Sequence, residues 1–409
     1  MKNVRHLLGI SGGKDSAALA IYMKDRYPHL DIEYYTCDTG KELEETYQLV
    51  KNLEIYLGKK ITLLKAADGS NEDPFDHFLK MYGGYLPSSN SRWCTKKLKL
   101  EPFEKFVGND NVISYVGIRG DEEREGYISR KSNIQSIFPF RKNIWSEDVI
   151  AKVLSNNNSN QVLNLYSNIA ATKNSNRFEE LLKQPISQSF TQTQKLNLLL
   201  DINIKEFNAL VFSFLKATNY PLAQEENFEL IDNEDILVRD DIFRILEESG
   251  VGIPAYYNKN EEFSFEFNGE KHLYGRSRSG CFFCFFQQKI EWIWLFENHL
   301  EKFLLAELYE TSNGNDSYFT WMDSGTLREL IGVPADIPLC RTKINSITGS
   351  KEIEWINEEV LKIRDTTKTD KVKMEYILKH KRKTSNPSSN LLIDILSETE
   401  GEGCAACFI

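Results

Sequence analysis

The chain has 409 residues, 41% of them hydrophobic, and a formal net charge of -10. This length and composition indicate a globular protein of two or three units, and the negative charge argues against a protein that coats nucleic acid non-specifically. No apolar run approaches the roughly 20 residues of a membrane span, and the N-terminus has no signal-peptide pattern, so we expect a cytoplasmic protein without a membrane partner. Seven cysteines in such a chain favour thiol chemistry or metal ligation over disulfides.

A glycine-rich turn follows the first predicted strand. The run 4–10 indicates a short buried strand, the apolar stretch 17–23 indicates a helix, and Ser11–Ser16 between them reads SGGKDS. Two adjacent glycines let the main chain approach a ligand, and N–H groups at a helix start attract an anion, so phosphate is the expected ligand. The spacing differs from the nucleoside triphosphatase loop, and an ordinary turn capped by Ser11 or Asp15 stays open as the alternative.

Strands and helices alternate through the first third of the chain. This alternation predicts a Rossmann-like α/β fold, in which a parallel sheet has helices on both faces and a ligand site beyond the carboxyl ends of its strands. Three turns are expected to meet at that edge: 11–16, 37–40 and 117–124. After the first helix, the predicted strands are 32–36, 61–66 and 112–118, and the predicted helices are 42–57, 74–82 and about 95–107.

The composition changes at Ser155, where a polar, low-complexity stretch precedes a dense apolar helical pattern at 196–215. We interpret 155–235 as a mainly helical insertion with a structural role. Further helices are predicted at 238–249, 287–309 (aromatic, interpreted as core packing rather than a base-stacking platform) and 353–363. The basic run 379–383 is interpreted as a solvated helix end, with phosphate contact as the alternative. The predicted units are a nucleotide-binding domain (1–154), the insertion (155–235), a cysteine-containing region (236–345) and a helical C-terminal region with a cysteine tail (346–409).

Four motifs in order resemble the phosphoadenosine phosphosulfate reductase family of the PP-loop, or adenine nucleotide alpha hydrolase, superfamily. The resemblance covers about 1–127. It continues less tightly at 252–257 and 280–284, which resemble the cysteine-containing branch that includes the DNA phosphorothioation sulfurtransferases. The motifs are SGGKDS; Asp38-Thr39-Gly40 with Glu45-Thr46-Tyr47; Arg92-Trp93-Cys94-Thr95 with Lys99 and Pro102; and Gly117-Ile118-Arg119 with Asp121-Glu122 and Arg124.

The complete SGGKDS form is similar to that of the ATP-using members, which implies ATP as the nucleotide. Gly12 and Gly13 would then present backbone donors to phosphates, and Asp15 would hold Mg²⁺. Asp38 is expected to bind ribose or metal, with a helix cap as the plainer alternative. The implied site also includes hydroxyl donors and turn residues (Ser11, Ser16, Thr39, Gly40, Gly117) and cations for the departing pyrophosphate (Lys14, Lys99, Arg119, Arg124).

The spacing of Cys281 and Cys284 is that of a knuckle that directs two thiolates at one metal. The resemblance implies a [4Fe-4S] cluster on these two residues with Cys94, and we take Cys340 as the fourth ligand. Structural zinc or a buried reduced pair are the alternatives, because the spacing does not choose between them. Of the other three cysteines, Cys37 is expected to be a small buried residue.

A second cysteine pair, Cys404 and Cys407, stands in the tail. It loosely resembles the mobile nucleophilic tail of sulfonucleotide reductases, and two such thiols can carry a persulfide and resolve it as a disulfide. An unstructured tail with incidental thiols or additional metal ligands is the alternative.

The resulting hypothesis is an ATP-dependent sulfurtransferase that adenylates an acceptor, releases pyrophosphate and lets sulfur displace AMP. A persulfide carrier such as a cysteine desulfurase would supply the sulfur. The acceptor is open, with nucleic acid among the candidates, and a homo-oligomer or a multi-protein complex is expected. The alternatives are a thiol-dependent sulfonucleotide reductase and a non-catalytic nucleotide-binding subunit of a complex for DNA modification or antiphage defence.

Overall fold

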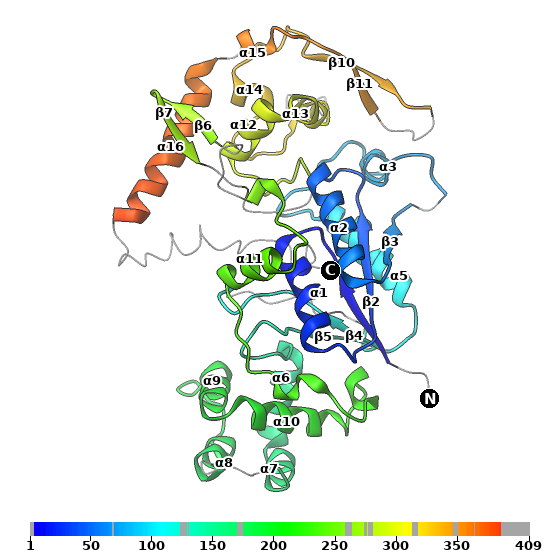
Figure 1. Cartoon of the computed structure of the whole chain (residues 1–409), viewed down its shortest axis with the longest axis vertical. Helices are drawn as coiled ribbons and strands as arrows, with labels where there is room; N and C mark the ends of the chain where they lie inside the picture. Colours follow the sequence, from blue (N-terminus) through cyan, green and yellow to red (C-terminus); the bar gives the residue numbers. More distant parts are fainter. Residues whose placement is uncertain are drawn as a thin grey trace.

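A five-stranded parallel sheet forms the centre of the molecule (Figure 1). The computed structural model describes residues 4–67, 69–122, 129, 131–169, 175–257, 264–273, 276, 281–312, 318–346, 351–363 and 365–385. The strand order β3-β2-β1-β4-β5 places β1 in the middle, and every neighbouring pair is parallel. This arrangement confirms the predicted α/β fold. The strands are β1 (Arg5–Gly9), β2 (Ile32–Asp38), β3 (Ile61–Lys65), β4 (Val112–Tyr115) and β5 (Ile134–Ile137).

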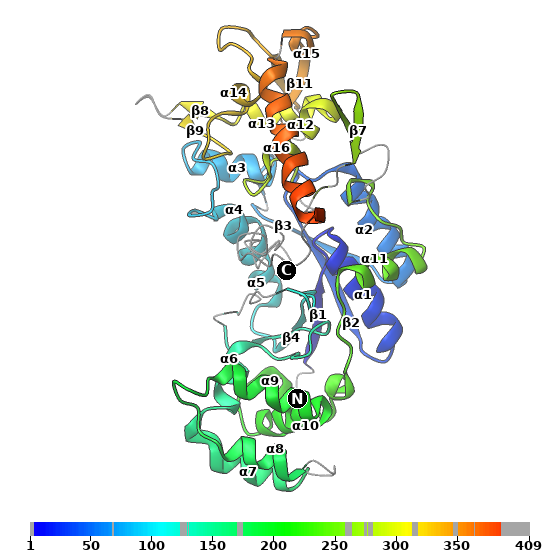
Figure 2. The ribbon, with the colours of Figure 1, turned by 90° about the vertical axis from the view of Figure 1, so that its left-hand side faces the viewer.

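Helices cover both faces of the sheet, as Figure 2 shows. Successive side chains of a strand point to opposite faces, so Leu8 packs in the hydrophobic cluster of α1 and α2, whereas Leu7 packs with Phe103 of α5. The first face carries α1 (Lys14–Arg26), α2 (Glu44–Leu57) and α11 (Arg239–Glu248). The second carries α4 (Trp93–Thr95), the π-helical turn η1 (Lys96–Leu100) and α5 (Glu101–Val107), and α3 (Pro74–Met81) lies beside the C-terminal region.

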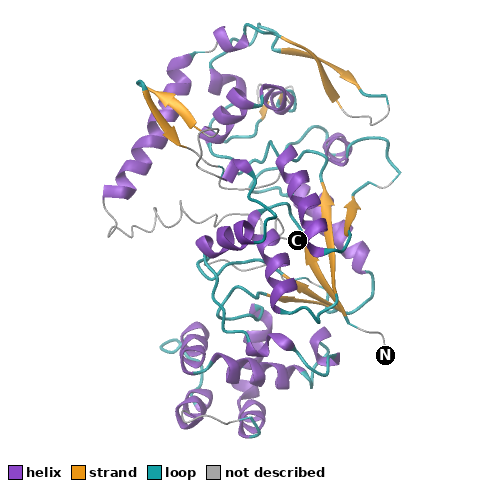
Figure 3. Cartoon of the chain, in the orientation of Figure 1, coloured by secondary structure: helices purple, strands orange, loops and turns teal. Residues whose placement is uncertain are grey.

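The predicted insertion is helical and lies at the lower end of the molecule in Figure 3. The pattern at 196–215 predicted one helix, but the structure has two. The chain breaks at Asn203, whose extended backbone and side chain cap α10 by accepting a hydrogen bond from the Glu206 N–H at 3.0 Å. Helix α6 (Glu147–Val153) precedes the insertion. The elements of the insertion are η2 (Asn156–Asn158), α7 (Ser159–Ser167), α8 (Ser175–Lys183), α9 (Gln192–Ile202), α10 (Ile204–Leu215), η3 (Pro221–Gln224) and η4 (Glu229–Asp232).

The insertion and the sheet share one hydrophobic cluster. Trp145 and Val149, which precede the insertion, belong to the same cluster as Phe178, Phe207 and the sheet residue Ile113. A second cluster lies at the other end of the molecule and joins α3 to the aromatic helices of the C-terminal region. The domain boundaries at 154, 235 and 345 stay predictions, and the packing adds that the insertion lies directly on the sheet.

The C-terminal region combines helices with short hairpins. The predicted helix 287–309 is two helices that meet at His299, and its aromatic side chains Trp292 and Phe296 are fully buried. None of the described helices combines the length and apolar character of a membrane span. The elements are η5 (Ala255–Tyr257), β6 (Ser264–Phe267), β7 (Glu270–Leu273), α12 (Lys289–Asn298), α13 (Leu300–Glu307), β8 (Thr311–Ser312), β9 (Tyr318–Phe319), α14 (Leu327–Ile331), β10 (Cys340–Ile344), β11 (Lys351–Ile356), α15 (Val360–Ile363) and α16 (Thr366–Ser385).

The helix predicted at 353–363 is wrong in its first half. Residues 351–356 form strand β11, which pairs antiparallel with β10. Acidic and apolar side chains alternate from Glu352 to Trp355, which is the period of a strand, and the helix begins only at Val360. The basic run 379–383 lies within α16, and its side chains are outside the described part of the structure.

Candidate functional site

The turn Ser11–Ser16 joins the carboxyl end of β1 to the first residue of α1. The two serines close the turn on themselves. The Ser16 hydroxyl accepts from the Ser11 N–H at 3.1 Å and donates to the Gly13 carbonyl at 3.1 Å. The Ser11 hydroxyl accepts from the Gly13 N–H at 3.3 Å. These serines therefore hold the loop in shape at the helix N-terminus, where an anion is favoured.

Gly12 is required by both its conformation and its surroundings. Its φ of +74° is a left-handed value, and a Cβ on it would lie 2.2 Å from Cγ2 of Thr46 in α2. The Thr46 hydroxyl lies 3.0 Å from the Tyr256 hydroxyl, which also donates to the Gly12 carbonyl at 3.5 Å. The turn thus packs against Thr46 of α2 and against Tyr256, which follows the insertion in the chain.

The turn leads into a buried ion cluster. One carboxylate oxygen of Asp15 lies 2.8 Å from the Arg119 guanidinium and the other lies 3.2 Å from the Lys14 ammonium. Arg119 also contacts Asp121 and Glu122, at 2.9 and 3.1 Å. The structure therefore brings together Lys14, Asp15 and Arg119, three of the predicted site residues. Each carboxylate oxygen of Asp15 contacts one cation, and Mg²⁺ binding by Asp15 stays a prediction.

Gly117 explains how β4 reaches this cluster. A Cβ on Gly117 would lie 2.9 Å from the backbone oxygen of Asp15, so the main chains touch there. This close approach lets Arg119 reach Asp15 from the turn that follows β4. Arg124, predicted on the same turn, lies outside the described residues.

The predicted turn after β2 is also anchored by buried charges. The Gly40 N–H donates to the Asp38 carboxylate at 2.8 Å, and this carboxylate also accepts from the Tyr47 hydroxyl at 3.2 Å. The adjacent Lys41 ammonium is buried and lies 3.3 Å from Asp73 and 3.0 Å from Asp76, both in or beside α3. Sequence reasoning missed the Lys41 network, because nothing in the spacing of a lone lysine indicates its partners.

Three cysteines line one small cavity of about 50 Å³ on the other side of this turn. Cys94 comes from α4, and Cys281 and Cys284 come from the segment before α12. The Cys281 sulfur lies 3.2 Å from the Thr39 hydroxyl, and Phe282 N–H donates to the Lys41 carbonyl at 2.9 Å. The cysteine knuckle therefore packs directly on the turn that follows β2. Lys99 of η1 also lines this cavity.

The cavity does not favour the ionised form of the Cys281 thiol unless a metal ion is bound. Burial raises the pKa of the Cys281 thiol well above its usual value, and the nearby Glu42 carboxylate adds to the shift while Lys99 opposes it. Burial likewise raises the pKa of Glu42, again opposed by Lys99. A metal ion deprotonates a coordinating thiol outright, so a bound cation would reverse this balance. Cys37, on β2, was expected to be buried but is only half-buried, and it packs against the cluster of Tyr35 and Phe103. Burial raises its pKa to about 11.

The structure does not bring Cys340 to the cavity. It begins β10, is absent from the residues that line the cavity, and has a pKa raised to about 11, chiefly by burial. Among the described residues, no three His, Cys, Asp or Glu side chains are close enough together to hold a metal ion. Cys94, Cys281 and Cys284 share a cavity without forming a preformed metal site. Cys404 and Cys407 lie outside the described residues.

Arg276 and Tyr257 were not among the predicted site residues. The Arg276 side chain is 3% exposed, and its Nε and Nη1 atoms have no hydrogen-bond partner in the described structure. The backbone N–H of Arg276 donates to the carbonyl of Tyr256 at 2.7 Å. The ring of the next residue, Tyr257, has its centre 5.0 Å from the Lys14 ammonium. The arginine-rich run before Cys281 is a sequence signal for such a residue, but it does not say which arginine is buried.

Comparison with known proteins agrees with the motifs. Residues 5–168 match the family model of the phosphoadenosine phosphosulfate reductase domain. An uncharacterized protein of Methanocaldococcus jannaschii is 34% identical over 154 residues, which are 34% of this chain and only 30% of the relative's own length. The solved structure of phosphoadenylyl-sulfate reductase from Candida auris, in complex with phosphate, is 19% identical in sequence. The match covers 36% of this chain and 68% of the reductase chain, with a TM-score of 0.26. Residues 5–168 of this chain therefore match the phosphoadenosine phosphosulfate reductase domain, which is the family that the four motifs resemble.

Proposed function

We propose that this protein is an ATP-dependent sulfurtransferase. The observation that supports it best is the 3.2 Å contact between the Thr39 hydroxyl and the Cys281 sulfur, because it joins the expected nucleotide turn to the cysteine-lined cavity. An adenylated acceptor on the carboxyl edge of the sheet would thus lie beside sulfur chemistry. The intact Lys14 and Asp15 in the first turn favour ATP over a sulfonucleotide.

The proposed reaction has two steps. An acceptor oxygen attacks the α-phosphorus of ATP, the α–β phosphoanhydride bond breaks, and pyrophosphate leaves. The terminal sulfur of a cysteine persulfide then attacks the adenylated centre and AMP leaves. A second thiol cleaves the S–S bond that remains and forms a disulfide, which a thiol reductant must reduce before the next cycle. The Lys14 and Arg119 cations, which lie around Asp15, would offset the charge that develops on pyrophosphate.

The cavity cysteines and the tail cysteines suit different roles. A buried thiol with a raised pKa is a poor nucleophile, so Cys281 suits metal ligation with Cys94 and Cys284 better than persulfide transfer. A bound iron–sulfur cluster or zinc ion would hold the knuckle against the turn and stabilise its thiolates. Under this proposal Cys404 and Cys407 carry the sulfur, which arrives from a persulfide carrier.

ATP radiolabelled at the α-phosphate tests the proposal. Incubation with the protein, a persulfide donor and a deproteinised cell extract that supplies the acceptor should yield labelled AMP, with pyrophosphate measured by a coupled assay. Asp15→Ala should abolish the reaction. Lys183→Ala, which removes an exposed charge of the insertion, is the matched control. Release of sulfite from an activated sulfate without ATP consumption would instead establish the sulfonucleotide reductase that the domain family suggests. ATP binding without turnover, unchanged by Asp15→Ala, would establish a non-catalytic subunit.

A further inference from the structure

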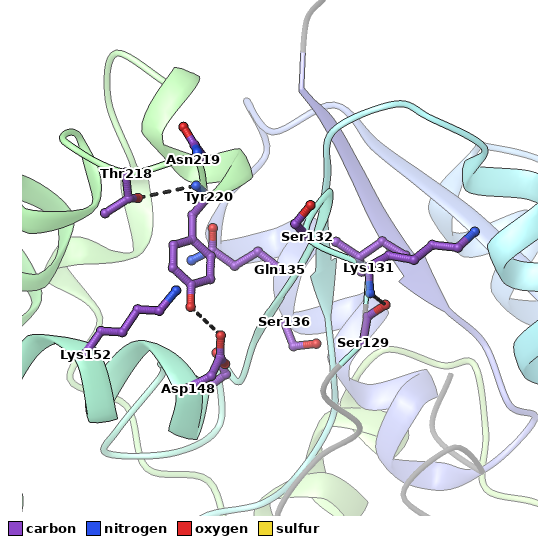
Figure 4. Close-up of a pocket in the computed structure, with 12 residues that line it drawn as sticks. Ser129, Lys131, Ser132, Gln135, Ser136, Asp148, Lys152, Thr218, Asn219 and Tyr220 are labelled. Carbon is purple, nitrogen blue, oxygen red and sulfur yellow. Dashed lines mark hydrogen bonds between the residues drawn. The ribbon is translucent and has the colours of Figure 1, made fainter.

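A cavity of about 430 Å³ lies between the edge strand β5 and the helical insertion (Figure 4). Its lining comes from β5, from α6 and from the turn 218–220 that follows α10. Gln135, on β5, is in register with Ile113 and through it with His6, near the amino end of β1. The Ser11–Ser16 turn follows the opposite, carboxyl end of β1. The cavity is therefore separate from the nucleotide turn.

Gln135 presents a buried donor at this cavity. The residue is 2% exposed, and its Oε1 accepts from the Leu222 N–H at 3.1 Å. This contact fixes the orientation of the amide, so its Nε2 group is left with two N–H donors and no acceptor among the described residues. A buried donor without an acceptor destabilises the folded protein, and a ligand that supplies an acceptor would remove this cost.

The charged residues that line the cavity are one carboxylate, Asp148, and two lysines, Lys131 and Lys152. The carboxylate of Asp148 accepts from the Tyr220 hydroxyl at 2.5 Å, and burial raises the pKa of Tyr220, so the phenol stays a donor. Lys152, one turn further along α6, places its ammonium 4.4 Å from the centre of the Tyr220 ring and forms no ion pair with a described carboxylate. Figure 4 shows Lys152 and Gln135 directed toward Tyr220, whereas Lys131 points away and contacts Glu104 at 3.5 Å.

We propose that this cavity binds a small molecule through a tetrahedral oxyanion, a phosphate or a sulfate group. Lys152 supplies the positive charge and Gln135 supplies amide donors, and an oxyanion offers only acceptors, which complements both. The volume leaves room for an organic substituent beside the anion. Because the cavity lies between the sheet and the insertion, occupancy would tie these two parts of the chain together. The proposal does not depend on the sulfurtransferase reaction.

Equilibrium dialysis of radiolabelled orthophosphate against the full chain tests the site. A saturating non-hydrolysable ATP analogue occupies the Ser11–Ser16 turn, so that phosphate retained beside it reports the cavity. We expect retention by the wild type and by Lys183→Met, an exposed lysine of the insertion outside the cavity, and at least tenfold weaker binding by Lys152→Met. Equal binding by Lys152→Met, or no retained phosphate, sulfate or phenyl phosphate, would overturn the proposal.

A second variant probes the buried donor. Gln135→Glu keeps the acceptor for the Leu222 N–H and replaces the amide donors by a negative oxygen, so it should weaken phosphate binding at least as much as Lys152→Met does. Thermal unfolding followed by circular dichroism identifies whether the variant is folded. A folded Gln135→Glu protein that retains wild-type phosphate affinity would contradict the assignment. If phenyl phosphate binds more tightly than orthophosphate, the ligand of the cavity is an organic phosphate or sulfate ester. If the two bind equally, the ligand is the inorganic ion. Either result supports the oxyanion site.

Discussion

Arg276 places a permanent charge inside the protein without a described hydrogen-bond partner for two of its nitrogens. Arginine stays protonated in proteins, so the charge cannot be removed by deprotonation. Its guanidinium carbon lies 5.8 Å from the Tyr256 ring centre and 5.9 Å from that of Trp294, and such aromatic faces offset only part of the cost of burial. An anion close to the Ser11–Ser16 turn would offset more of it.

Replacing Arg276 should therefore change stability and ligand binding in opposite directions. We expect Arg276→Met to raise the free energy of unfolding of the nucleotide-free protein by about 1 kcal/mol or more, because the buried charge is removed. The increase in melting temperature on addition of ATP should become smaller. Differential scanning calorimetry with and without ATP measures both. Arg244→Met, an exposed arginine of α11, should change neither quantity, and a variant with an undiminished ATP response would exclude Arg276 from the nucleotide site.

At the scale of elements, one carboxylate closes the connection between α13 and α14. Glu310 accepts from the backbone N–H groups of Trp321 at 3.0 Å and Leu327 at 2.7 Å. Burial nevertheless raises its pKa from 4.5 to about 7. The folded state therefore binds a proton more tightly than the unfolded state does between these two values.

This difference predicts that stability falls as the pH rises from about 4.5 to 7. The stabilising contribution of Glu310 is fully present below pH 4.5, the pKa in the unfolded chain, and it is lost as the pH rises to about 7, the pKa in the folded protein. One pKa unit corresponds to about 1.36 kcal/mol. Urea denaturation at several pH values between 5 and 8 measures the slope. In Glu310→Gln the slope should become smaller, even if the variant is less stable throughout. An unchanged slope would show that other groups cause it.

The break between α9 and α10 gives a second prediction at this scale. Asn203→Ala removes the side chain that caps α10, and we expect the free energy of unfolding to fall by about 1 kcal/mol. Chemical denaturation measures the change. Asn160→Ala, at an exposed position in α7, is the control, because alanine favours a helix there and no loss is expected. Equal effects at the two positions would argue against a specific cap at Asn203.

At the scale of the whole molecule, the cysteine cavity is built from distant parts of the chain. Cys94 belongs to the N-terminal half, and Cys281 and Cys284 follow the entire insertion. We propose that these residues hold an iron–sulfur cluster rather than zinc. Anaerobically purified protein should then contain iron and sulfide, and Cys94→Ser should lose most of both. Cys340→Ser and Cys37→Ser should keep them. Metal analysis and absorption spectroscopy test this, and zinc without iron would overturn the iron–sulfur assignment.

The sequence predicted the strands β1 to β4 and the turns after β1, β2 and β4, because these depend on local patterns, but the edge strand β5 was not predicted. SGGKDS, the strand 32–36 and the motif at Gly117 lie where the alternation of elements predicts them. The breaks at Asn203 and His299 were missed because a continuous apolar pattern hides a cap within it. The segment 252–257 is part of the resemblance, but the contact of Tyr256 with the turn was not predicted, because it forms only through tertiary packing over more than two hundred residues.

The contact between Gly12 and Tyr256 has a consequence for synthesis. The two residues are 244 positions apart, so most of the chain must leave the ribosome before the tyrosine can reach the turn. The N-terminal strands can begin to pair earlier, but the turn cannot acquire its final neighbours during that period. The nascent domain should therefore bind ATP poorly until α11 and the residues just after it have emerged, which delays nucleotide binding until the insertion has been translated.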